Sequence, residues 1–188
     1  MFNLEKITVA KLWALEDETL FNSYLELQKV LNPVPVFCGL KAKALGSLEF
    51  GQVANLKEYI SNPTPAGILD AFKIVFGVKE KTYLAADVVS YFYALNWITE
   101  EMQKLVDLEA KMLADKPDPL MDMAGAKALD MFRELPVLDM LAQRYSQPPQ
   151  IVETWSYNFV FGILLMIKKT AEVRTEYNRL EKLSKPIK

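Results

Sequence analysis

Three groups of acidic residues are the parts of this sequence with the side chains for metal chemistry. Carboxylate oxygens are the ligands that Mg²⁺ prefers, so a cluster of them could support a magnesium-dependent helical enzyme. The groups are Glu16-Asp17-Glu18, Glu100-Glu101 with Asp107, and Asp118 with Asp122. Each group also has a structural explanation, because carboxylates suit helix N-termini and solvent-exposed helix faces. We expect the structural explanation and predict neither a catalytic nor a metal site.

The composition argues against other kinds of active site. The 188 residues include no histidine, which removes Ser-His-Asp and Cys-His nucleophilic systems together with imidazole metal ligands. The one cysteine, Cys38, has no histidine to lower its pKa, so we expect a small core residue instead of a nucleophile. Neither a Gly-x-Gly-x-x-Gly sequence nor a phosphate-loop Gly-Lys-Ser/Thr occurs, so no cofactor is predicted.

Charge and hydropathy narrow the class of partner. The chain has 22 basic and 24 acidic residues and a formal charge of −2, so no global field attracts nucleic acid or anionic lipid. Its longest apolar run, residues 159–167, is about half of the roughly 20 residues that a membrane-spanning helix needs. The N-terminal residues lack a basic segment followed by an apolar one, so no signal peptide is predicted. We expect a cytoplasmic protein that binds neither nucleic acid nor membrane.

The elements that would position any site are helices. Prolines and glycines divide the chain into segments of helical periodicity, and long alternating strands are missing. We therefore predict an all-α helical bundle in a single domain over residues 1–188. In this bundle residues 1–46 form an N-terminal segment that packs on the rest, and residues 147–188 form a C-terminal docking helix.

Local signals delimit the shorter elements of the first half. Residues 34–37 must be extended because of their prolines, and we predict that they pair with residues 7–9 as a small two-stranded element. The expected helices are Asp17 to Leu31, residues 52–60, and a helix capped by Thr64 that has Pro65 at its first position and ends at Gly77.

Two long helices, over about residues 82–114 and 151–183, share one spacing of apolar residues. The steps alternate between four and three, which is the period of helices that pack at shallow crossing angles. On the first helix, which Thr82 is expected to cap, the seam is Leu84, Val88, Tyr91, Leu95, Ile98, Met102, Leu105 and Met112, with Glu109 as its polar member. On the second it is Phe159, Ile163, Met166, Thr170, Val173, Tyr177 and Leu180. We predict that the two helices are antiparallel neighbours.

Two further helices are expected between the long ones. Residues 120–134 are predicted to be helical, with Leu129 and Phe132 directed inward. Pro136 is expected to start another short helix, which carries Leu138, Leu141 and Tyr145.

Both long helices carry more apolar surface than one buried stripe needs. Tyr91, Phe92 and Tyr93 point in three directions, so either the bundle surrounds this helix or one face serves a partner. On the last helix, residues 155–167 are apolar nearly all round and are expected in the core. Beyond them the seam continues among charged residues, which suits an outer helix or a subunit contact. The predicted partner interface is Val173, Tyr177, Leu180, Leu183, Tyr93 and Trp97.

Four short segments form a recognisable set: Leu48-Glu49-Phe50-Gly51-Gln52, Ala124-Gly125-Ala126-Lys127-Ala128-Leu129 with Phe132, Leu138-Asp139-Met140-Leu141-Ala142, and Trp155-Ser156-Tyr157-Asn158-Phe159-Val160-Phe161 leading into residues 164–169. These segments resemble small helical proteins encoded among tailed-bacteriophage virion genes, some like tail assembly chaperones and others like head-to-tail ring components. That group more often has Leu-Pro-Tyr before its last helix, where this chain has Trp155-Ser156-Tyr157. The resemblance implies assembly through protein contacts, without catalytic residues.

The leading hypothesis is a non-enzymatic structural or assembly protein of a tailed bacteriophage. It would form a homo-oligomer and contact other phage structural proteins in the host cytoplasm, and a ring component would stay in the virion. Two alternatives remain open, namely a carboxylate-based magnesium-dependent helical enzyme and a cellular helical adaptor. Neighbouring capsid, portal or tail genes would separate the phage hypothesis from the adaptor.

Overall fold

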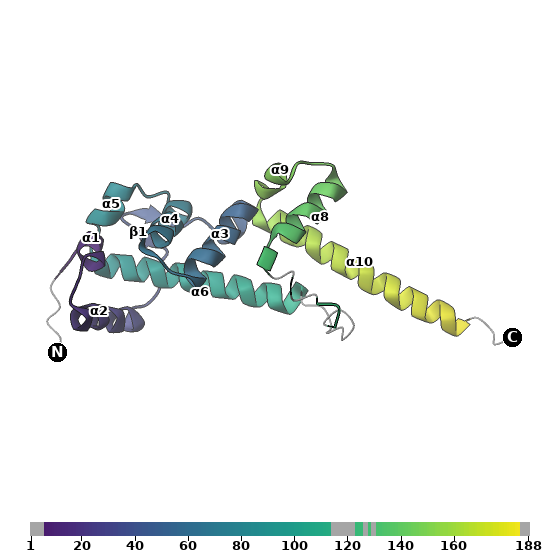
Figure 1. The fold of residues 1–188 in the computed structure, drawn as a ribbon, viewed down its shortest axis with the longest axis horizontal. Coiled ribbons are helices and arrows are strands. Elements are labelled where there is room, and N and C mark those ends of the chain that lie inside the picture. Colours follow the sequence, from purple (N-terminus) through teal and green to yellow (C-terminus); the bar gives the residue numbers. More distant parts are fainter. Residues whose placement is uncertain (1–5, 114–122, 126–127, 129–130, 185–188) are drawn as a thin grey trace. The chain divides into compact units, whose positions relative to one another are not determined.

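The computed structural model describes residues 6–113, 123–125, 128 and 131–184 (Figure 1). Among these residues helices make up nearly all of the regular structure, and the one sheet has two strands, which confirms the all-α prediction. The chain forms two compact units, residues 1–106 and residues 107–188, and the boundary lies inside one long helix, α6 (Val88–Leu113). We call them the N-terminal unit and the C-terminal unit. The predicted single domain stays a prediction.

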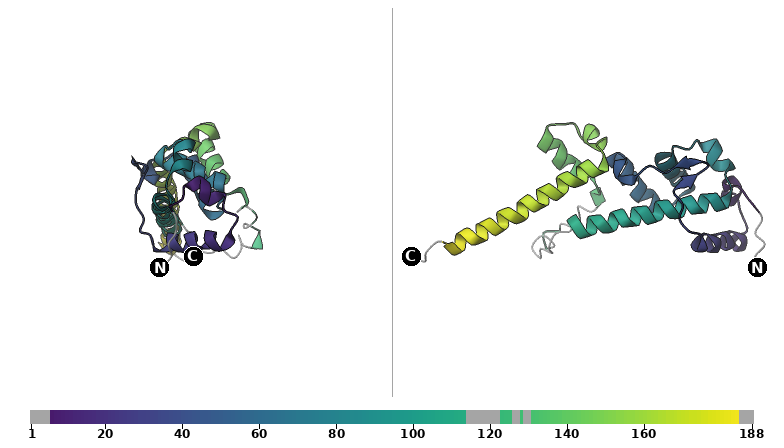
Figure 2. Two further views of the ribbon diagram at one scale, coloured as in Figure 1. Left: turned by 90° about the vertical axis from the view of Figure 1, so that its left-hand side faces the viewer. Right: turned by 180° about the vertical axis from the view of Figure 1, so that it is seen from behind.

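The N-terminal unit contains short helices and most of α6 (Figure 2). Its elements before α6 are α1 (Val9–Trp13), α2 (Glu18–Val30), β1 (Val36–Phe37), β2 (Leu40–Lys41), the 3₁₀ turn η1 (Leu45–Ser47), α3 (Phe50–Ser61), α4 (Pro65–Phe76) and α5 (Glu80–Ala85). The helix expected after Asp17 is confirmed, since the Asp17 carboxylate accepts a hydrogen bond from the N–H of Leu20 at 3.0 Å.

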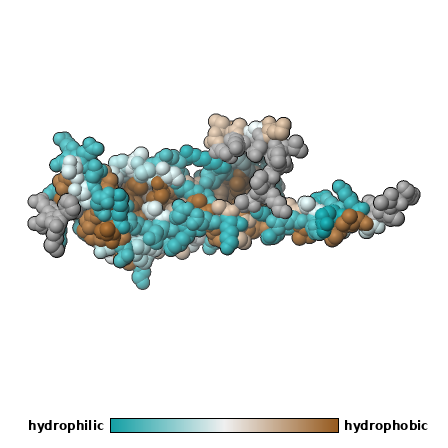
Figure 3. Space-filling model, turned by 90° about the horizontal axis from the view of Figure 1, so that it is seen from below, coloured by the Kyte–Doolittle hydropathy of each residue, from teal (hydrophilic) through white to brown (hydrophobic). Residues whose placement is uncertain are grey.

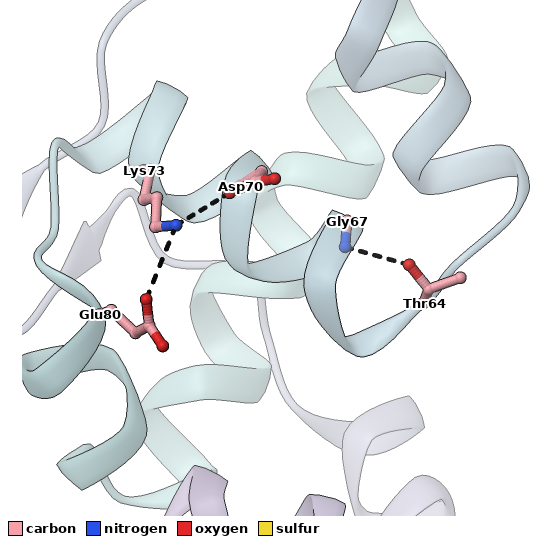
Figure 4. Close-up of polar contacts among 5 residues, drawn as sticks. All are labelled: Thr64, Gly67, Asp70, Lys73 and Glu80. Atoms are coloured by element: carbon pink, nitrogen blue, oxygen red, sulfur yellow. Dashed lines mark hydrogen bonds and ion pairs between the residues drawn. The ribbon is translucent and has the colours of Figure 1, made fainter.

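Helix α4 begins and ends as its sequence predicts (Figure 4). The Thr64 hydroxyl accepts a hydrogen bond from the N–H of Gly67 at 3.0 Å, and Gly77 takes up the left-handed conformation with φ of +67°. On the exposed side of α4, Lys73 pairs with Asp70 at 3.0 Å and reaches Glu80 of α5 at 4.0 Å. Exposed pairs of this kind contribute about 0–1 kcal/mol, so the caps and the apolar face determine where α4 forms.

The small sheet differs from the prediction in its pairing. Residues 34–37 were expected to pair with residues 7–9, but β1 pairs antiparallel with β2. Cys38 and Gly39 form the connection with φ of +49° and +77°, the conformation that a tight two-residue hairpin turn requires.

The prediction that Cys38 is a core residue is wrong, because its position in this turn leaves the side chain exposed. Partial burial and the nearby Asp87 raise the pKa of the Cys38 thiol, which disfavours the reactive thiolate.

The first long helix is interrupted close to its predicted start. Instead of one helix from Thr82, α5 ends at Ala85 and α6 begins at Val88. The Asp87 carboxylate accepts a hydrogen bond from the N–H of Ser90 at 2.8 Å and so caps α6. The segment preceding α1 binds at this break, where the N–H of Val88 donates to the carbonyl of Ile7 at 3.0 Å.

The core of the N-terminal unit is a cluster of aromatic rings centred on Phe72. Its ring centroid lies 4.7 Å from Phe37, 5.5 Å from Phe76, 5.2 Å from Tyr83 and 5.3 Å from Tyr91. All five side chains are buried. The cluster therefore joins β1, α4, α5 and α6 through one set of contacts.

The C-terminal unit contains the end of α6, α8 (Leu135–Tyr145), α9 (Pro149–Glu153) and α10 (Tyr157–Ser184). The predicted helix over 151–183 is divided, because α9 ends at Glu153 and α10 begins at Tyr157. Thr154 follows α9 as its C-cap, and its hydroxyl donates to the carbonyl of Ile151 at 2.8 Å. The start of a helix beside Pro136 is confirmed. The inward prediction for Phe132 is wrong, since a positive φ at Arg133 breaks the helix there and Phe132 is exposed. Leu129 and much of the predicted helix 120–134 lie outside the described residues.

Candidate protein-interaction surface

Helix α10 begins as part of the packed core of the C-terminal unit. Tyr157, Val160 and Ile163 are buried, and they occupy one side of its first two turns. The Tyr157 hydroxyl donates a hydrogen bond to the Glu109 carboxylate on the last part of α6 at 2.8 Å. Burial, and secondly the bond to Glu109, raise the pKa of Tyr157 well above its usual value. Glu109, the polar member of the α6 seam, thus has a specific partner on α10 that the sequence reasoning missed.

A second side of α10 carries large apolar residues that remain exposed, and we call them the α10 stripe. Their exposed fractions are 55% for Phe159, 49% for Met166, 70% for Val173, 64% for Tyr177, 51% for Leu180 and 71% for Leu183. Figure 3 shows hydrophobic surface close to the C-terminal end of α10. Contiguous exposed apolar surface of this kind is typical of a protein-contact site.

The stripe corrects two predictions. Residues 155–167 were expected to be core nearly all round, but Phe159 and Met166 are both about half exposed. The seam was also expected to be largely covered by the matching seam of the first long helix. From Met166 to Ser184, however, no side chain is buried, and all those after Lys168 are exposed. The four-three spacing identified the apolar residues of this face, but it did not indicate whether the chain itself covers them.

Charged pairs stabilise the helical conformation of the outer part of α10. The Lys169 ammonium lies 2.7 Å from the Glu172 carboxylate, and Arg179 binds Glu176 through two nitrogens at 2.8 and 2.7 Å. Both pairs have the one-turn spacing that stabilises exposed helices by a few tenths of a kcal/mol each. The hydrogen bonds from Arg179 lower the pKa of Glu176. These charges lie alongside the stripe, so α10 presents an apolar line with defined charges at its border.

Two predicted interface residues belong to the N-terminal unit. Tyr93 and Trp97 are half-buried on α6, and the Trp97 ring centroid lies 6.4 Å from that of Phe76. The carbonyl of Tyr93 accepts a hydrogen bond from the N–H of Val34 at 3.0 Å. These contacts give both residues a role in packing their own unit. The predicted interface is therefore split, with Val173, Tyr177, Leu180 and Leu183 on one face of α10 and these two in the other unit.

Described residues of each unit also line a hollow. In the N-terminal unit a cavity of about 350 Å³ is lined mainly by apolar residues of α1, α2 and α6, including Trp13, Phe21 and Leu95. In the C-terminal unit an open groove of about 1050 Å³ runs along another side of α10, lined by Leu164, Ala171 and Met140 of α8 among others. The lining of the N-terminal cavity is predominantly apolar, whereas charged side chains of α10, among them Lys168 and Glu172, also line the groove.

The acidic groups do not form a metal centre in the part of the chain that the structure describes. Within it no three His, Cys, Asp or Glu residues are placed to hold one ion. Asp17 caps α2, and Glu101 pairs with Lys104 at 2.7 Å on the surface of α6. Asp118 and Asp122 lie outside the described residues. None of the described helices combines the length and the apolar character that crossing a bilayer requires.

The described residues form an all-α fold, and their last helix, α10, has an apolar face that is exposed. Comparison with protein-family models, curated proteins and solved structures finds no match to the chain. A functional role must therefore be inferred from the residues of the stripe and from the charged residues at its border.

Proposed function

We propose that the protein is a non-enzymatic structural or assembly protein of a tailed bacteriophage that acts through contacts made by α10. The observation that carries the contact role is the exposed α10 stripe between Phe159 and Leu183. The phage context rests on the short segments that resemble virion and tail assembly proteins.

The energetics of the stripe favour an interface. Full burial of a Val, Leu, Phe or Met side chain contributes about 1.5–3 kcal/mol, and the six stripe residues are now about half exposed or more. Burying what remains exposed would contribute several kcal/mol, enough to offset part of the entropy that association costs. A long helix that presents an apolar line is also a common form of protein recognition, in which residues one turn apart act as anchors.

The test is assembly of particles by a phage that lacks this gene and is supplied with variants of the protein. Val173→Glu and Tyr177→Glu place a charge in the stripe, and we expect either variant to reduce the yield of infectious particles at least ten-fold. Thr175→Glu is the matched control, because it adds the same charge to the same helix on the opposite side and should assemble normally.

Equal yields from the stripe variants and the wild type would contradict the proposal, provided that circular dichroism shows the variants to be folded. Mass spectrometry of purified particles then separates the two kinds of phage protein, since a ring component stays in the particle and an assembly chaperone leaves it. A genomic neighbourhood without capsid, portal or tail genes would instead favour a cellular adaptor that uses the same surface.

A further inference from the structure

We propose that the α10 stripe binds a second copy of the chain, with the two α10 helices antiparallel and fully overlapping. This inference rests on the proposed contact role of α10 and adds the partner, the direction and the register. Three features on α10 support it, namely the heptad positions of the stripe, the charges at its border and one glycine.

Five of the six stripe residues have the positions of a coiled-coil core, and the sixth, Leu183, is a g position. In heptad notation Phe159, Met166, Val173 and Leu180 occupy the d positions, and Ile163, Thr170, Tyr177 and Ser184 occupy the a positions. An antiparallel pair places each d residue of one helix opposite an a residue of the other. When α10 overlaps a second α10 from Phe159 to Ser184, Met166 lies opposite Tyr177 of the second copy, and Thr170 lies opposite Val173.

The border charges distinguish the two directions. Lys169 and Glu176 are g positions, and Arg174 and Glu181 are e positions. In a parallel pair each g residue meets the following e residue of the partner helix, so Lys169 would face Arg174 and Glu176 would face Glu181. Both contacts join like charges and are unfavourable. In the antiparallel pair g residues face g residues, and Lys169 faces Glu176 of the second copy twice by the two-fold symmetry.

The same charges select the register. A shift of one heptad that leaves only the C-terminal parts of the two helices overlapping brings Glu176 against Glu176 of the second copy. A shift of one heptad that leaves only the N-terminal parts overlapping brings Lys169 against Lys169 of the second copy. A shift of two heptads in the first direction avoids these repulsions, but it leaves Phe159 and Met166 without an opposing helix. Full overlap is therefore the register that buries the most stripe residues without repulsion.

Gly162 supplies an independent fit. It is the one glycine of α10, at a g position, and an added Cβ there would find no heavy atom within 4 Å. A glycine inside a helix costs about 0.5–1 kcal/mol relative to alanine, so open space beside it calls for an explanation. In the proposed register the residue opposite Gly162 is Leu183 of the second copy, whose side chain is 71% exposed in the single chain. The missing side chain would make room for this leucine.

The side of α10 that packs on its own unit borders this contact in the first turns of the helix. Val160, an e position, and Ile163, an a position, are only 0% and 6% exposed. At this end of α10 the second copy would therefore contact the d and g positions, Phe159 and Gly162, which lie on the exposed side. The pairs Lys169 with Glu172 and Glu176 with Arg179 would have to share their charges with the second copy. Such exposed pairs are weak, so sharing costs little.

Sedimentation of the full chain tests partner and direction together. We expect a dimer that Glu176→Lys weakens about ten-fold in Kd, because two attractive Lys-Glu contacts become repulsive. In a parallel dimer the same variant would replace Glu-Glu by Lys-Glu contacts and would strengthen association. Lys169→Glu should weaken the dimer similarly, and the double variant Lys169→Glu with Glu176→Lys should restore it. Lys182→Glu, the same charge change off the stripe, is the control.

A distance measurement tests the direction separately. Spin labels at Lys182→Cys, in a chain that also carries Cys38→Ser, should lie about 30 Å apart along the axis in the fully overlapping antiparallel pair. A parallel pair would bring them to roughly the interhelical distance of 10 Å plus the label lengths and would overturn the proposal.

The outcomes separate this inference from the proposed function. A chain that stays monomeric at about 0.1 mM, well above a micromolar Kd, overturns the homodimer. The contact role would still stand if Val173→Glu abolished particle assembly. Conversely, a dimer with the expected charge response, together with normal assembly by Val173→Glu, would retain the dimer and refute the proposed function.

Discussion

The aromatic core of the N-terminal unit and the outer half of α10 are both rich in large apolar residues, but these residues are buried in the first region and exposed in the second. Phe72, Tyr83 and Tyr91 are at most 1% exposed, whereas Val173, Tyr177 and Leu183 are at least 64% exposed. The α6 seam, which contributes Tyr91 to the core, and α10 have the same alternating four-three spacing. The difference therefore comes from what surrounds each helix.

On α6 the seam is covered by residues from distant parts of the sequence. Tyr91 stacks on Phe72 of α4 at 5.3 Å and meets Tyr83 of α5 at 5.9 Å, and Trp13 of α1 approaches it from another side at 6.4 Å. On α10 the buried residues stop at Ile163. The comparison teaches that the aromatic core is covered by residues of its own unit, whereas one apolar face of α10 stays exposed.

The largest expected effect is loss of the aromatic core. Phe72→Ala removes a fully buried ring that contacts four other rings, and we expect it to lower the free energy of unfolding by about 3–5 kcal/mol. Urea denaturation followed by tryptophan fluorescence measures this change. A loss below about 1 kcal/mol would show that this cluster is far less tightly packed than the ring distances indicate.

A smaller effect is expected at the polar contact that anchors the start of α10. Tyr157→Phe removes the hydroxyl that donates to Glu109, leaving a half-buried carboxylate with one bond fewer, so we expect a loss of about 1–3 kcal/mol. Thermal unfolding of the C-terminal unit reports the loss. Tyr145→Phe is the control, because Tyr145 is exposed and should tolerate the same change.

The raised pKa of Tyr157 gives this prediction a pH dependence. The unfolded chain releases the tyrosine proton near pH 10, but the folded chain retains it to higher pH. The stabilisation is therefore complete below about pH 10 and declines as the pH rises above it. Tyr157→Phe should reduce this alkaline decline, and an identical decline in variant and wild type would contradict the assignment.

Features set by neighbouring residues could be predicted from the sequence, and features set by distant contacts could not. Thr64, Pro65 and Gly77 mark the ends of α4 correctly because a helix cap depends on a few adjacent residues. The hairpin turn at Cys38 was missed because only glycine among its two residues signals a positive φ. The break before Val88 was missed because Thr82 and Asp87 are both acceptable caps, and the contacts of Ile7 favour the second.

The candidate site shows the same division. The sequence predicts an exposed apolar face at Val173, Tyr177, Leu180 and Leu183, because charged residues surround a narrow apolar line there. Phe159 and Met166 were assigned to the core because their neighbours are apolar all round. Only the three-dimensional arrangement shows that the packed side of α10 passes through Val160 and leaves these two residues outside.

The third prediction concerns the cap that separates α5 from α6. Asp87→Ala should destabilise the N-terminal unit by about 1 kcal/mol, because the N–H of Ser90 loses its acceptor. Partial burial alone would raise the pKa of Asp87, but hydrogen bonds from Ser90 and nearby backbone N–H groups lower it overall. The cap therefore contributes above about pH 4, and its contribution is lost as the pH falls further. Denaturation at neutral and acid pH should show a difference between variant and wild type only at neutral pH.

The smallest expected effect on stability is at the α10 stripe, and it tests the comparison most directly. Val173→Thr replaces an exposed apolar residue by a polar one of similar shape, so in the dilute single chain we expect a change within about 0.5 kcal/mol. At protein concentrations where α10 is paired, the same variant should lower the melting temperature, because a polar hydroxyl would then replace an apolar methyl in the contact with the second copy. Thermal unfolding at two concentrations a hundred-fold apart measures both values. A stability loss that is equal at both concentrations would mean that Val173 packs within its own chain, and the contrast between α10 and the aromatic core would then disappear.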